Sequence, residues 1–218
     1  MHPNAVIFDF DFTLADSSKA IVECVAVALS ELGFEAVPPE KIVETVGLTL
    51  GDTLTYLTGI SDGGLARRFA QYFHHRADEI MNSATVMYES VRPVMRCLRT
   101  ANLRTAIVST KLNYRIKGIL AANSLEKFVD VIVGADDVTN PKPDPEGLIL
   151  AVRRLGVSPE RAVYVGDHVV DAEAADNAGI FFIAVLSGRH LVSDFQHYAP
   201  CAIVESIRDL PQVLGLSQ

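Results

Sequence analysis

The sequence predicts an α/β protein, a doubly wound parallel sheet with a helical segment inserted after its first strand. In the second half of the chain, short apolar runs rich in β-branched residues alternate with helical patterns, which is typical of βαβ crossovers and a parallel sheet. Residues 17–84, by contrast, contain helical patterns and no convincing strand. The first strand, Ala5–Phe8, precedes this helical stretch and ends at two carboxylates, Asp9 and Asp11.

Apolar residues recur at helical spacing throughout the inserted stretch. Ser17 or Ser18 can cap the first of these helices, and Gly33 is a suitable stop. A turn at residues 62–64 separates the last helix from the one before it. The expected helices cover residues 17 or 18 to 32, 38–46, 52–59 and 65–81.

Strands and helices alternate from residue 86 onward. We expect strands or extended segments at residues 86–88, 105–108, 129–133, 162–165, 180–185 and 202–204, and helices at residues 92–100, 113–123, 145–155, 170–178 and 206–214. The predicted organisation is therefore an α/β core domain formed by residues 1–16 and 85–218, with an inserted helical domain at residues 17–84.

The composition is that of an ordinary soluble globular protein. Of its 218 residues, 49% are hydrophobic and 21% are charged. The formal net charge of −8 argues against general nucleic-acid binding, which needs a basic face. The three cysteines lie far apart, so we expect neither a zinc site nor a disulfide framework, and a reducing, cytoplasmic location. We see no signal-peptide pattern and no apolar run near the ~20 residues that span a bilayer, so no membrane association is expected.

The two acids after the first strand are the first candidate site. Residues i and i+2 of a strand point to the same side, so Asp9 and Asp11 can face one site. Two like charges that lie close together need a cation or a proton between them, which indicates a hard metal ion, a shared proton, or both. The structural alternative is an acidic turn from strand to helix, with Asp16 or Ser17 as the helix cap.

Polar groups follow three further strands at the same position. These groups are Ser109 with Thr110 and Lys111, Lys142 between two prolines, and Asp167 with Asp171. The carboxyl ends of parallel strands converge on one crevice. Carboxylates there suit magnesium, while a hydroxyl, free backbone N–H groups and a lysine suit phosphate oxygens.

Each of these groups also has a purely structural interpretation. Ser109 or Asp167 can cap a following helix, Lys142 can be a surface lysine in a turn, and Asp171 can be a first-turn acid stabilised by the helix dipole. His168 is expected to be a solvent-facing loop residue. His74 and His75 lack metal-ligand spacing and are expected on a solvated helix face.

Taken in order, the four groups resemble the motifs of the haloacid dehalogenase-like superfamily, in its phosphoglycolate-phosphatase-like branch. The first motif runs from Asp9 to Leu14, the second is Ser109, the third is Lys142 in Lys-Pro-Asp-Pro, and the fourth extends from Gly166-Asp167 to Asp171. The resemblance covers nearly the whole chain and implies a Rossmann-like core with a helical cap. Phe12 is a departure, because these enzymes commonly have glycine at this position.

The resemblance implies a magnesium-dependent phosphatase. Asp9 would attack phosphorus to form an aspartyl-phosphate, and Asp11 would act as general acid and base. The implied catalytic residues are Asp9, Asp11, Ser109 and Lys142; the implied substrate-binding residues are Phe10, Thr110 and Lys111; the implied metal ligands are Asp9, Asp11 (through its backbone carbonyl), Asp167 and Asp171.

A small phosphorylated metabolite is the expected partner, with a phosphoglycolate-like compound the first choice. A sugar phosphomutase of the β-phosphoglucomutase type, a pyrophosphatase, a nucleotide phosphatase and an inactive phospholigand-binding relative remain alternatives. A monomer and a homodimer are equally compatible with the sequence.

Overall fold

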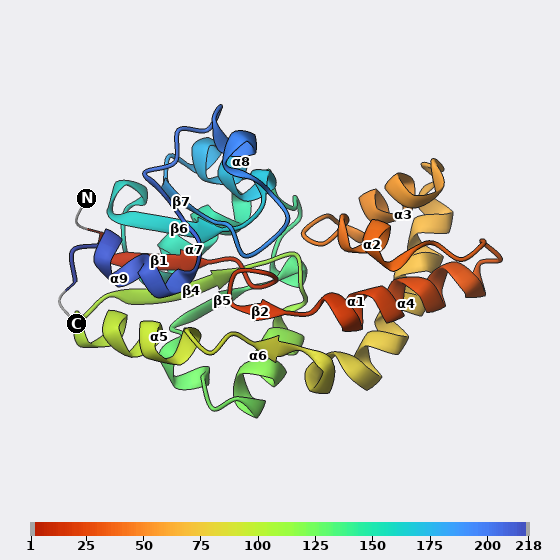
Figure 1. The fold of residues 1–218 in the computed structure, drawn as a ribbon, viewed down its shortest axis with the longest axis horizontal. Helices are drawn as coiled ribbons and strands as arrows, with labels where there is room; N and C mark the ends of the chain where they lie inside the picture. Colours follow the sequence, from red (N-terminus) through yellow and green to blue (C-terminus); the bar gives the residue numbers. More distant parts are fainter. Residues whose placement is uncertain (1–2, 217–218) are drawn as a thin grey trace. The chain divides into compact units, whose positions relative to one another are not determined.

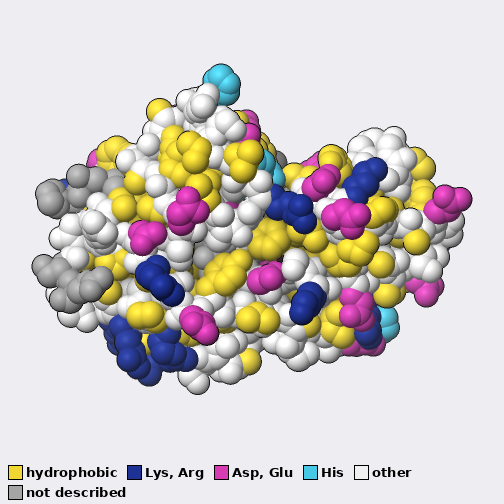
Figure 2. Space-filling model, in the orientation of Figure 1, with side chains coloured by type: hydrophobic (Ala, Val, Ile, Leu, Met, Phe, Trp, Pro, Cys, Tyr) yellow, Lys and Arg dark blue, Asp and Glu magenta, His cyan; other side chains and the backbone are white. Residues whose placement is uncertain are grey.

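The computed structural model describes residues 3–216, and the chain divides into two compact units. One is an α/β unit, formed by the chain up to Ala15 and from Met87 onward. The other is a helical unit, Asp16–Val86. No helix among the described residues has the length and hydrophobicity to cross a membrane. On the face shown in Figure 2, acidic and basic side chains are interspersed.

The α/β unit contains a six-stranded sheet in the order β5-β4-β1-β6-β7-β8 (Figure 1). Every pairing in this sheet is parallel, and β1 lies between β4 and β6, with Phe8 opposite Ile107 on one side and Val165 on the other. The predicted parallel, doubly wound sheet is therefore confirmed. Its strands are β1 (Ala5–Phe8), β4 (Arg104–Val108), β5 (Val131–Val133), β6 (Ala162–Gly166), β7 (Phe181–Val185) and β8 (Ala202–Val204).

The strand order places a topological switch at β1. The chain first moves from β1 to β4 and β5, and then returns past β1 to β6 and β7. Right-handed crossovers in opposite directions put helices on both faces of such a sheet, and a crevice opens at the carboxyl ends of the strands where the direction changes. The helices of this unit are α5 (Val91–Thr100), α6 (Asn113–Ala122), α7 (Glu146–Leu155), α8 (Val169–Ala178) and α9 (Leu210–Val213).

The apolar core on one face of the sheet is formed by strand residues and by α7 and α8. Ile7, Ala106 and Tyr164 are buried there against Leu148 of α7 and Ala175 of α8. These strand residues are fully or almost fully buried, as expected for strands covered on both faces. This packing holds the ends of β1, β4 and β6 in a fixed relation, which positions the site.

Two predicted elements of the α/β unit differ from the structure. The strand expected at residues 129–133 begins only at Val131, because Val129 closes the short 3₁₀ helix Glu126–Phe128. The helix expected at residues 206–214 is divided into a 3₁₀ turn, Ile207–Asp209, and the short helix α9. Pro211 lacks an N–H group and is tolerated only in the first turn of a helix, so a new helix begins there.

The helical unit consists of α1 (Ser18–Glu31), α2 (Pro39–Val43), α3 (Leu50–Thr58) and α4 (Gly63–Ala84). Helix α1 packs against α4. Helices α3 and α4 begin two residues earlier than expected, because Thr49 and Asp62 accept N–H bonds from Asp52 and Leu65. The helices expected within residues 17–84 are present, joined by turns and irregular segments, and no residue of this stretch is assigned to a strand.

The chain passes between the units at two short strands, of which only the second was expected, as part of the extended segment at residues 86–88. Strand β2 (Ala15–Asp16) pairs with β3 (Val86–Met87). Ser17, expected as a helix cap, instead forms a hydroxyl–hydroxyl hydrogen bond of 3.1 Å with Thr85. Ser17 is the N-cap residue of α1 by position only, and Asp16, the other expected cap, accepts a hydrogen bond from the Ser18 N–H group at 2.8 Å.

Candidate active site

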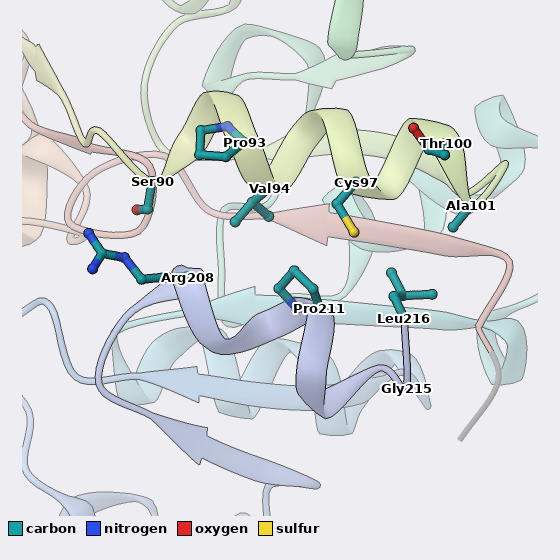
Figure 3. Close-up of a pocket in the computed structure, with 10 residues that line it drawn as sticks. All are labelled: Ser90, Pro93, Val94, Cys97, Thr100, Ala101, Arg208, Pro211, Gly215 and Leu216. Carbon is teal, nitrogen blue, oxygen red and sulfur yellow. The ribbon is translucent and has the colours of Figure 1, made fainter. Parts of the chain in front are cut away.

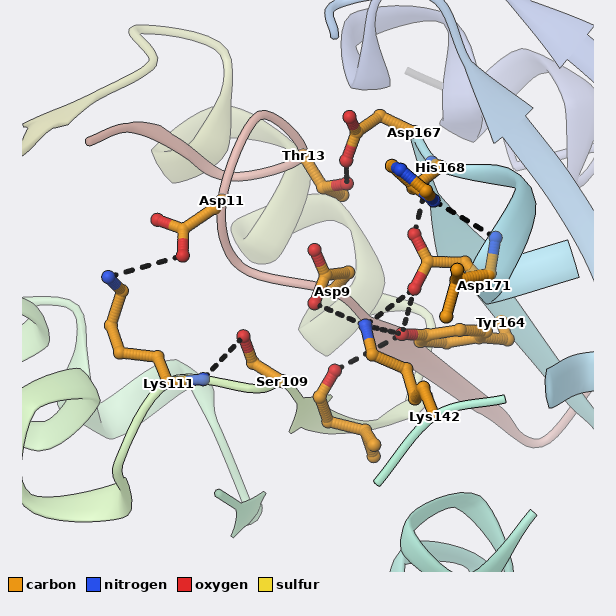
Figure 4. A network of polar contacts seen from close by, with 12 residues as sticks. Asp9, Asp11, Thr13, Ser109, Lys111, Lys142, Tyr164, Asp167, His168 and Asp171 are labelled. Carbon is orange, nitrogen blue, oxygen red and sulfur yellow. Dashed lines mark hydrogen bonds and ion pairs between the residues drawn. The ribbon is translucent and has the colours of Figure 1, made fainter. Parts of the chain in front are cut away.

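The carboxyl ends of β1, β4 and β6 bring most of the predicted site residues together (Figure 4). Asp9 follows β1 directly, and Ser109 follows β4. Asp167 follows β6, and Asp171 lies in the first turn of α8. The groups therefore lie at the topological switch, where a parallel sheet places its ligands.

Lys142 is the centre of the polar network. Its ammonium nitrogen lies 2.9 Å from Asp9 Oδ1 and 2.5 Å from Asp171 Oδ1, and the Lys142 side chain is only 6% exposed. The interpretation of Lys142 as a surface lysine is therefore wrong. Burial alone would lower the pKa of Lys142, but the charges of Asp171 and Asp9 outweigh this effect and raise it well above the ordinary value. The lysine is thus held in its charged form between two carboxylates.

Three carboxylates gather beside this lysine. Oxygen atoms of Asp9, Asp167 and Asp171 all lie within 4.8 Å of one another, and all three residues are buried. Burial raises the pKa of Asp9 to about 7, although Lys142 partly opposes the shift. Burial, together with the charges of Asp171 and Asp9, also raises the pKa of Asp167 well above its ordinary value. One ammonium cannot balance three carboxylates, so this all-oxygen, electron-rich cluster fits a hard divalent cation.

Asp11 does not join this cluster with its carboxylate. Its Oδ2 lies 3.1 Å from Lys111 Nζ, and both side chains are buried. Its Oδ1 is buried and makes no hydrogen bond to any described residue. An unpaired oxygen on a buried acid is costly, and it is free to bond to a ligand that enters the site.

The residues expected to bind substrate differ in their surroundings. Phe10 is completely buried, with its ring 5.8 Å from the ammonium of Lys111. Ser109 is buried, and its hydroxyl accepts the N–H bond of Lys111 at 3.3 Å rather than capping helix α6, whose N-cap is Leu112. Thr110 lies between them in the chain and is half-buried. Roles for Phe10 and Thr110 in binding stay predictions.

His168 is not the solvent-facing residue that the sequence suggested. It is the N-cap residue of α8, and its Nδ1 accepts the N–H bond of Val170 at 3.0 Å. In the reciprocal contact, Asp171 Oδ2 accepts a hydrogen bond from the backbone N–H group of His168 at 3.1 Å. Burial lowers the pKa of His168 to about 4, so the ring is neutral at pH 7. The cap explains why Asp171 is held rigidly at the first turn, and it also shows that Asp167 is not the capping residue.

Several supporting residues were not identified from the sequence. Thr13 Oγ1 donates to Asp167 Oδ1 at 3.2 Å, and Gly188 leaves room for the same carboxylate. The Tyr164 hydroxyl lies 2.9 Å from Asp171 Oδ1. Burial and the charge of Asp171 raise the pKa of Tyr164 well above its ordinary value, so its hydroxyl stays neutral. The only sign of Tyr164 in the sequence is a tyrosine inside an otherwise apolar strand. Its distance along the chain from the other site residues follows no pattern that would indicate a role in the site.

Phe12, the departure from the family motif, adopts the conformation for which glycine is favoured. Its φ of 58° lies in the left-handed region, which costs a residue with a side chain roughly 1–2 kcal/mol. The hydroxyl of Ser187 donates to the Phe12 carbonyl oxygen and holds the turn. The turn after β1 therefore keeps the left-handed backbone conformation without the glycine.

A separate cavity of about 620 Å³ lies between α5 and the C-terminal elements of the α/β unit (Figure 3). Its lining is mostly apolar and includes Val94, Cys97, Pro211 and Leu216. Arg208 is the only charged side chain among the residues that line it. Without a carboxylate, this cavity lacks the acid–base groups gathered at the strand ends.

The model of the haloacid dehalogenase-like hydrolase family matches residues 6–185 of the chain. The chain belongs to this family. Among curated relatives, pyrophosphatase PpaX from Bacillus cereus is 30% identical over 218 residues, covering 99% of this chain and 98% of the relative. PpaX from Bacillus velezensis is 29% identical over 212 residues, covering 97% and 96% of the two chains.

Solved structures agree with the family assignment. A structure described as a haloacid dehalogenase-like hydrolase from Bacteroides fragilis superposes with a TM-score of 0.93 at 38% identity, covering 95% of this chain and 99% of that one. A structure described as a phosphoglycolate phosphatase from Lactobacillus plantarum gives a TM-score of 0.84 at 23% identity, covering 98% and 100%, and so shows the same fold. The protein is thus a hydrolase of the haloacid dehalogenase-like family, and the site at the strand ends is its candidate active site.

Proposed function

We propose that the protein is a magnesium-dependent phosphatase that hydrolyses a small phosphorylated metabolite through an aspartyl-phosphate on Asp9. The observation that carries the proposal is the position of Lys142, whose ammonium bridges Asp9 and Asp171 beside a third buried carboxylate. A phosphate group is repelled by carboxylates unless cations offset their charge, and this site combines a fixed ammonium with a cluster suited to a divalent ion.

Asp9 and Asp11 divide the chemistry between them. A carboxylate oxygen of Asp9 forms the bond to phosphorus as the bond to the leaving oxygen breaks. Asp11 donates a proton to that leaving oxygen, and afterwards accepts one from the water that attacks the aspartyl-phosphate. The unpaired Oδ1 of Asp11 supports this role, because it makes no hydrogen bond within the described residues and can therefore bond to a ligand.

The remaining groups bind the transferring phosphoryl group. The Ser109 hydroxyl and the Thr110 N–H group hold its oxygens, and Lys142 balances the charge that develops on them. Asp9, Asp167 and Asp171 would hold magnesium, with the backbone carbonyl of Asp11 as a further ligand. When bound, the ion supplies Lewis-acid stabilisation of the phosphoryl oxygens. Residues 17–84 act as a cap that selects the substrate.

Pyrophosphate and phosphoglycolate are the two substrates to be compared first. Pyrophosphate is favoured by the PpaX relatives, which match along almost the whole chain at 29–30% identity. Phosphoglycolate is favoured by the motif resemblance. Both are small dianionic or more highly charged phosphates, and both suit the same phosphoryl-transfer groups.

The test begins with para-nitrophenyl phosphate, pyrophosphate and 2-phosphoglycolate, each assayed with magnesium and after chelation. We expect turnover only with the metal. Asp9→Asn should abolish turnover and the phosphoenzyme, because an amide oxygen is a poor nucleophile. Asp11→Asn keeps the nucleophile and should lose about 10²–10⁴-fold in rate, the usual contribution of a positioned acid or base.

With para-nitrophenyl phosphate, Asp11→Asn should accumulate phosphate on Asp9. This substrate has a good leaving group, so its first step suffers less than the later attack by water. Mass spectrometry after an acid quench would detect the mass gain on the peptide that contains Asp9. Full activity after exhaustive chelation would reject the metal, and a phosphopeptide at Ser109 or His168 would reject the mechanism.

A further inference from the structure

One buried hydroxyl, that of Tyr164, connects three segments of the site (Figure 4). It lies 3.1 Å from Lys142 Nζ, 2.9 Å from Asp171 Oδ1 and 3.1 Å from the carbonyl oxygen of Val108. Tyr164 has no exposed surface, so these are direct contacts within the protein interior. Val108 is the last residue of β4 and immediately precedes Ser109.

Tyr164 is well placed to orient its neighbours because its own position is rigid. It is the third residue of β6, pairs with Ile7 of β1 and Phe182 of β7, and packs in the core between the sheet and its helices. Lys142, by contrast, belongs to the irregular segment before α7. A long, flexible side chain from such a segment needs a fixed partner if its ammonium is to stay in one place.

The hydrogen atoms of the Lys142 ammonium are fully used. An ammonium has three N–H donors, and those of Lys142 go to Asp9, Asp171 and the Tyr164 hydroxyl. A phosphoryl oxygen of the substrate can accept a bond from Lys142 only if one of these three contacts is released. The two carboxylates are charged acceptors and the phenol oxygen is neutral, so the contact with Tyr164 is the weakest of the three.

The hydroxyl also anchors the lysine to the sheet. While it accepts from Lys142, its single hydrogen can be donated to Asp171 or to the Val108 carbonyl oxygen. Either bond directs a lone pair of the phenol oxygen toward the ammonium. No other neutral group is shown bonding to Lys142 among the described residues.

We propose that Tyr164 is a positioning residue, whose hydroxyl holds the Lys142 ammonium between Asp9 and Asp171 and is the contact that the lysine exchanges for a phosphoryl oxygen. The inference rests on the proposed phosphatase function and deepens it. Tyr164 does not touch the substrate. It fixes the lysine before the substrate arrives and then releases one N–H group to it.

The exchange has a distinctive kinetic consequence in Tyr164→Phe. Without the hydroxyl, one N–H group of Lys142 is free, so inorganic phosphate no longer competes with the phenol oxygen and should inhibit at a several-fold lower concentration. The ammonium is also less well oriented, so kcat should fall roughly ten-fold, the loss typical of one hydrogen bond to a charged group. KM for para-nitrophenyl phosphate should not rise.

Tyr198→Phe is the matched control. It makes the same chemical change in the same unit, and the Tyr198 hydroxyl makes no hydrogen bond to any described residue. This variant should keep the parent values of kcat and of the phosphate inhibition constant. A fraction of misfolded enzyme would lower kcat but would not tighten phosphate inhibition, so the two readouts together separate positioning from structural damage.

The outcomes are distinct. If the parent enzyme shows no magnesium-dependent turnover, the proposed function fails and this inference fails with it. If the parent is active, a parent-like kcat in Tyr164→Phe, or phosphate inhibition that is unchanged or weaker, overturns the role of Tyr164 alone. Tyr164→Met fills the space of the ring without a hydroxyl and should repeat the pattern. If both variants lose their cooperative thermal transition, Tyr164 is a structural residue and the proposal is rejected.

Discussion

Around the clustered carboxylates Asp9, Asp167 and Asp171, single residues are packed with almost no spare volume. Gly188 is the clearest case, because a Cβ atom built on it would lie 2.0 Å from Asp167 Oδ2 and 2.8 Å from Asp167 Cγ. The φ angle of Gly188 is outside the left-handed region, so its backbone does not require glycine. The requirement comes from the neighbouring carboxylate, which occupies the space that a side chain would take.

Gly188→Ala should therefore weaken magnesium binding. The added methyl group must displace the Asp167 carboxylate, and displaced or unsupported ligands typically cost about 10–100-fold in metal affinity. The magnesium concentration that gives half-maximal turnover measures this effect. Gly51→Ala is the control, since its Cβ would meet nothing nearer than 3.8 Å. An unchanged magnesium requirement in Gly188→Ala would show that Asp167 tolerates the shift or does not bind the metal.

At the scale of secondary-structure elements, the partly buried carboxylate of Asp137, which ends the 3₁₀ helix Ala135–Asp137, joins this turn to α6 and α7. Asp137 Oδ2 accepts bonds from Asn113 Nδ2 at 2.6 Å and from the Gly134 N–H group at 3.0 Å, and Oδ1 lies 3.0 Å from a guanidinium nitrogen of Arg154. Asn113 begins α6 and Arg154 lies in α7. Burial opposes ionisation of Asp137, but the bonds from Asn113, Gly134 and Arg154 outweigh it and lower its pKa.

Asp137→Asn should lower the free energy of unfolding at pH 7 by about 1 kcal/mol, the usual net value of such a hydrogen bond. Because the folded pKa is depressed, the stabilisation is present above the unfolded pKa of 3.8 and is lost as the pH falls through the lower folded value. The difference between parent and variant in urea unfolding should therefore shrink between pH 7 and pH 3. Asp209→Asn, which changes an exposed residue without a side-chain cap bond, should show no comparable difference at either pH.

Elements were predictable from the sequence where one pattern dominated. The strands β1, β4 and β6 are continuous apolar runs, and α7 and α8 end at Gly156 and Gly179, both left-handed. The prediction of one continuous α-helix at residues 206–214 was wrong in its first turn, which is 3₁₀, because apolar spacing was given more weight than Pro211. The extended segment expected at residues 86–88 contains β3, but local patterns could not reveal β2, since it has only two residues and exists through its pairing with β3.

Site residues were predictable when their position in the chain implied their position in space. Asp9, Ser109 and Asp167 each follow a strand, so the parallel sheet alone brings them to one edge. The cap at His168 and the hydroxyl of Tyr164 depend instead on side-chain contacts made after folding. Such contacts join residues whose separation in sequence has no regular spacing, and no pattern indicates them.

At the scale of the whole molecule, the two units have separate interiors. In the helical unit Leu29, Leu54 and Phe69 are buried, and α1 packs on α4. In the α/β unit the core lies between the sheet and helices such as α7 and α8. The chain crosses between them only at the paired strands β2 and β3.

Replacing residues 17–84 by a short glycine–serine turn should leave a folded α/β unit, because its core draws on residues outside that stretch. Circular dichroism and thermal unfolding would test the fold. Since the proposed catalytic groups all remain, we expect residual magnesium-dependent turnover of para-nitrophenyl phosphate. Preference among pyrophosphate, 2-phosphoglycolate and sugar phosphates should largely disappear. A truncated protein with the parent's order of preference would contradict the role given to the helical unit.

The central position of β1 has a consequence for the order of events on the ribosome. This strand precedes the helical unit in the chain, yet its two neighbours are β4 and β6, and β6 ends only at Gly166. The helical unit, whose helices all lie between Ser18 and Ala84, emerges complete long before that. Domains generally fold as units during synthesis. The nascent chain therefore carries a finished helical unit while β1 still lacks its neighbour β6. Asp9 and Asp167, which follow these two strands, come together only after β6 has been synthesised.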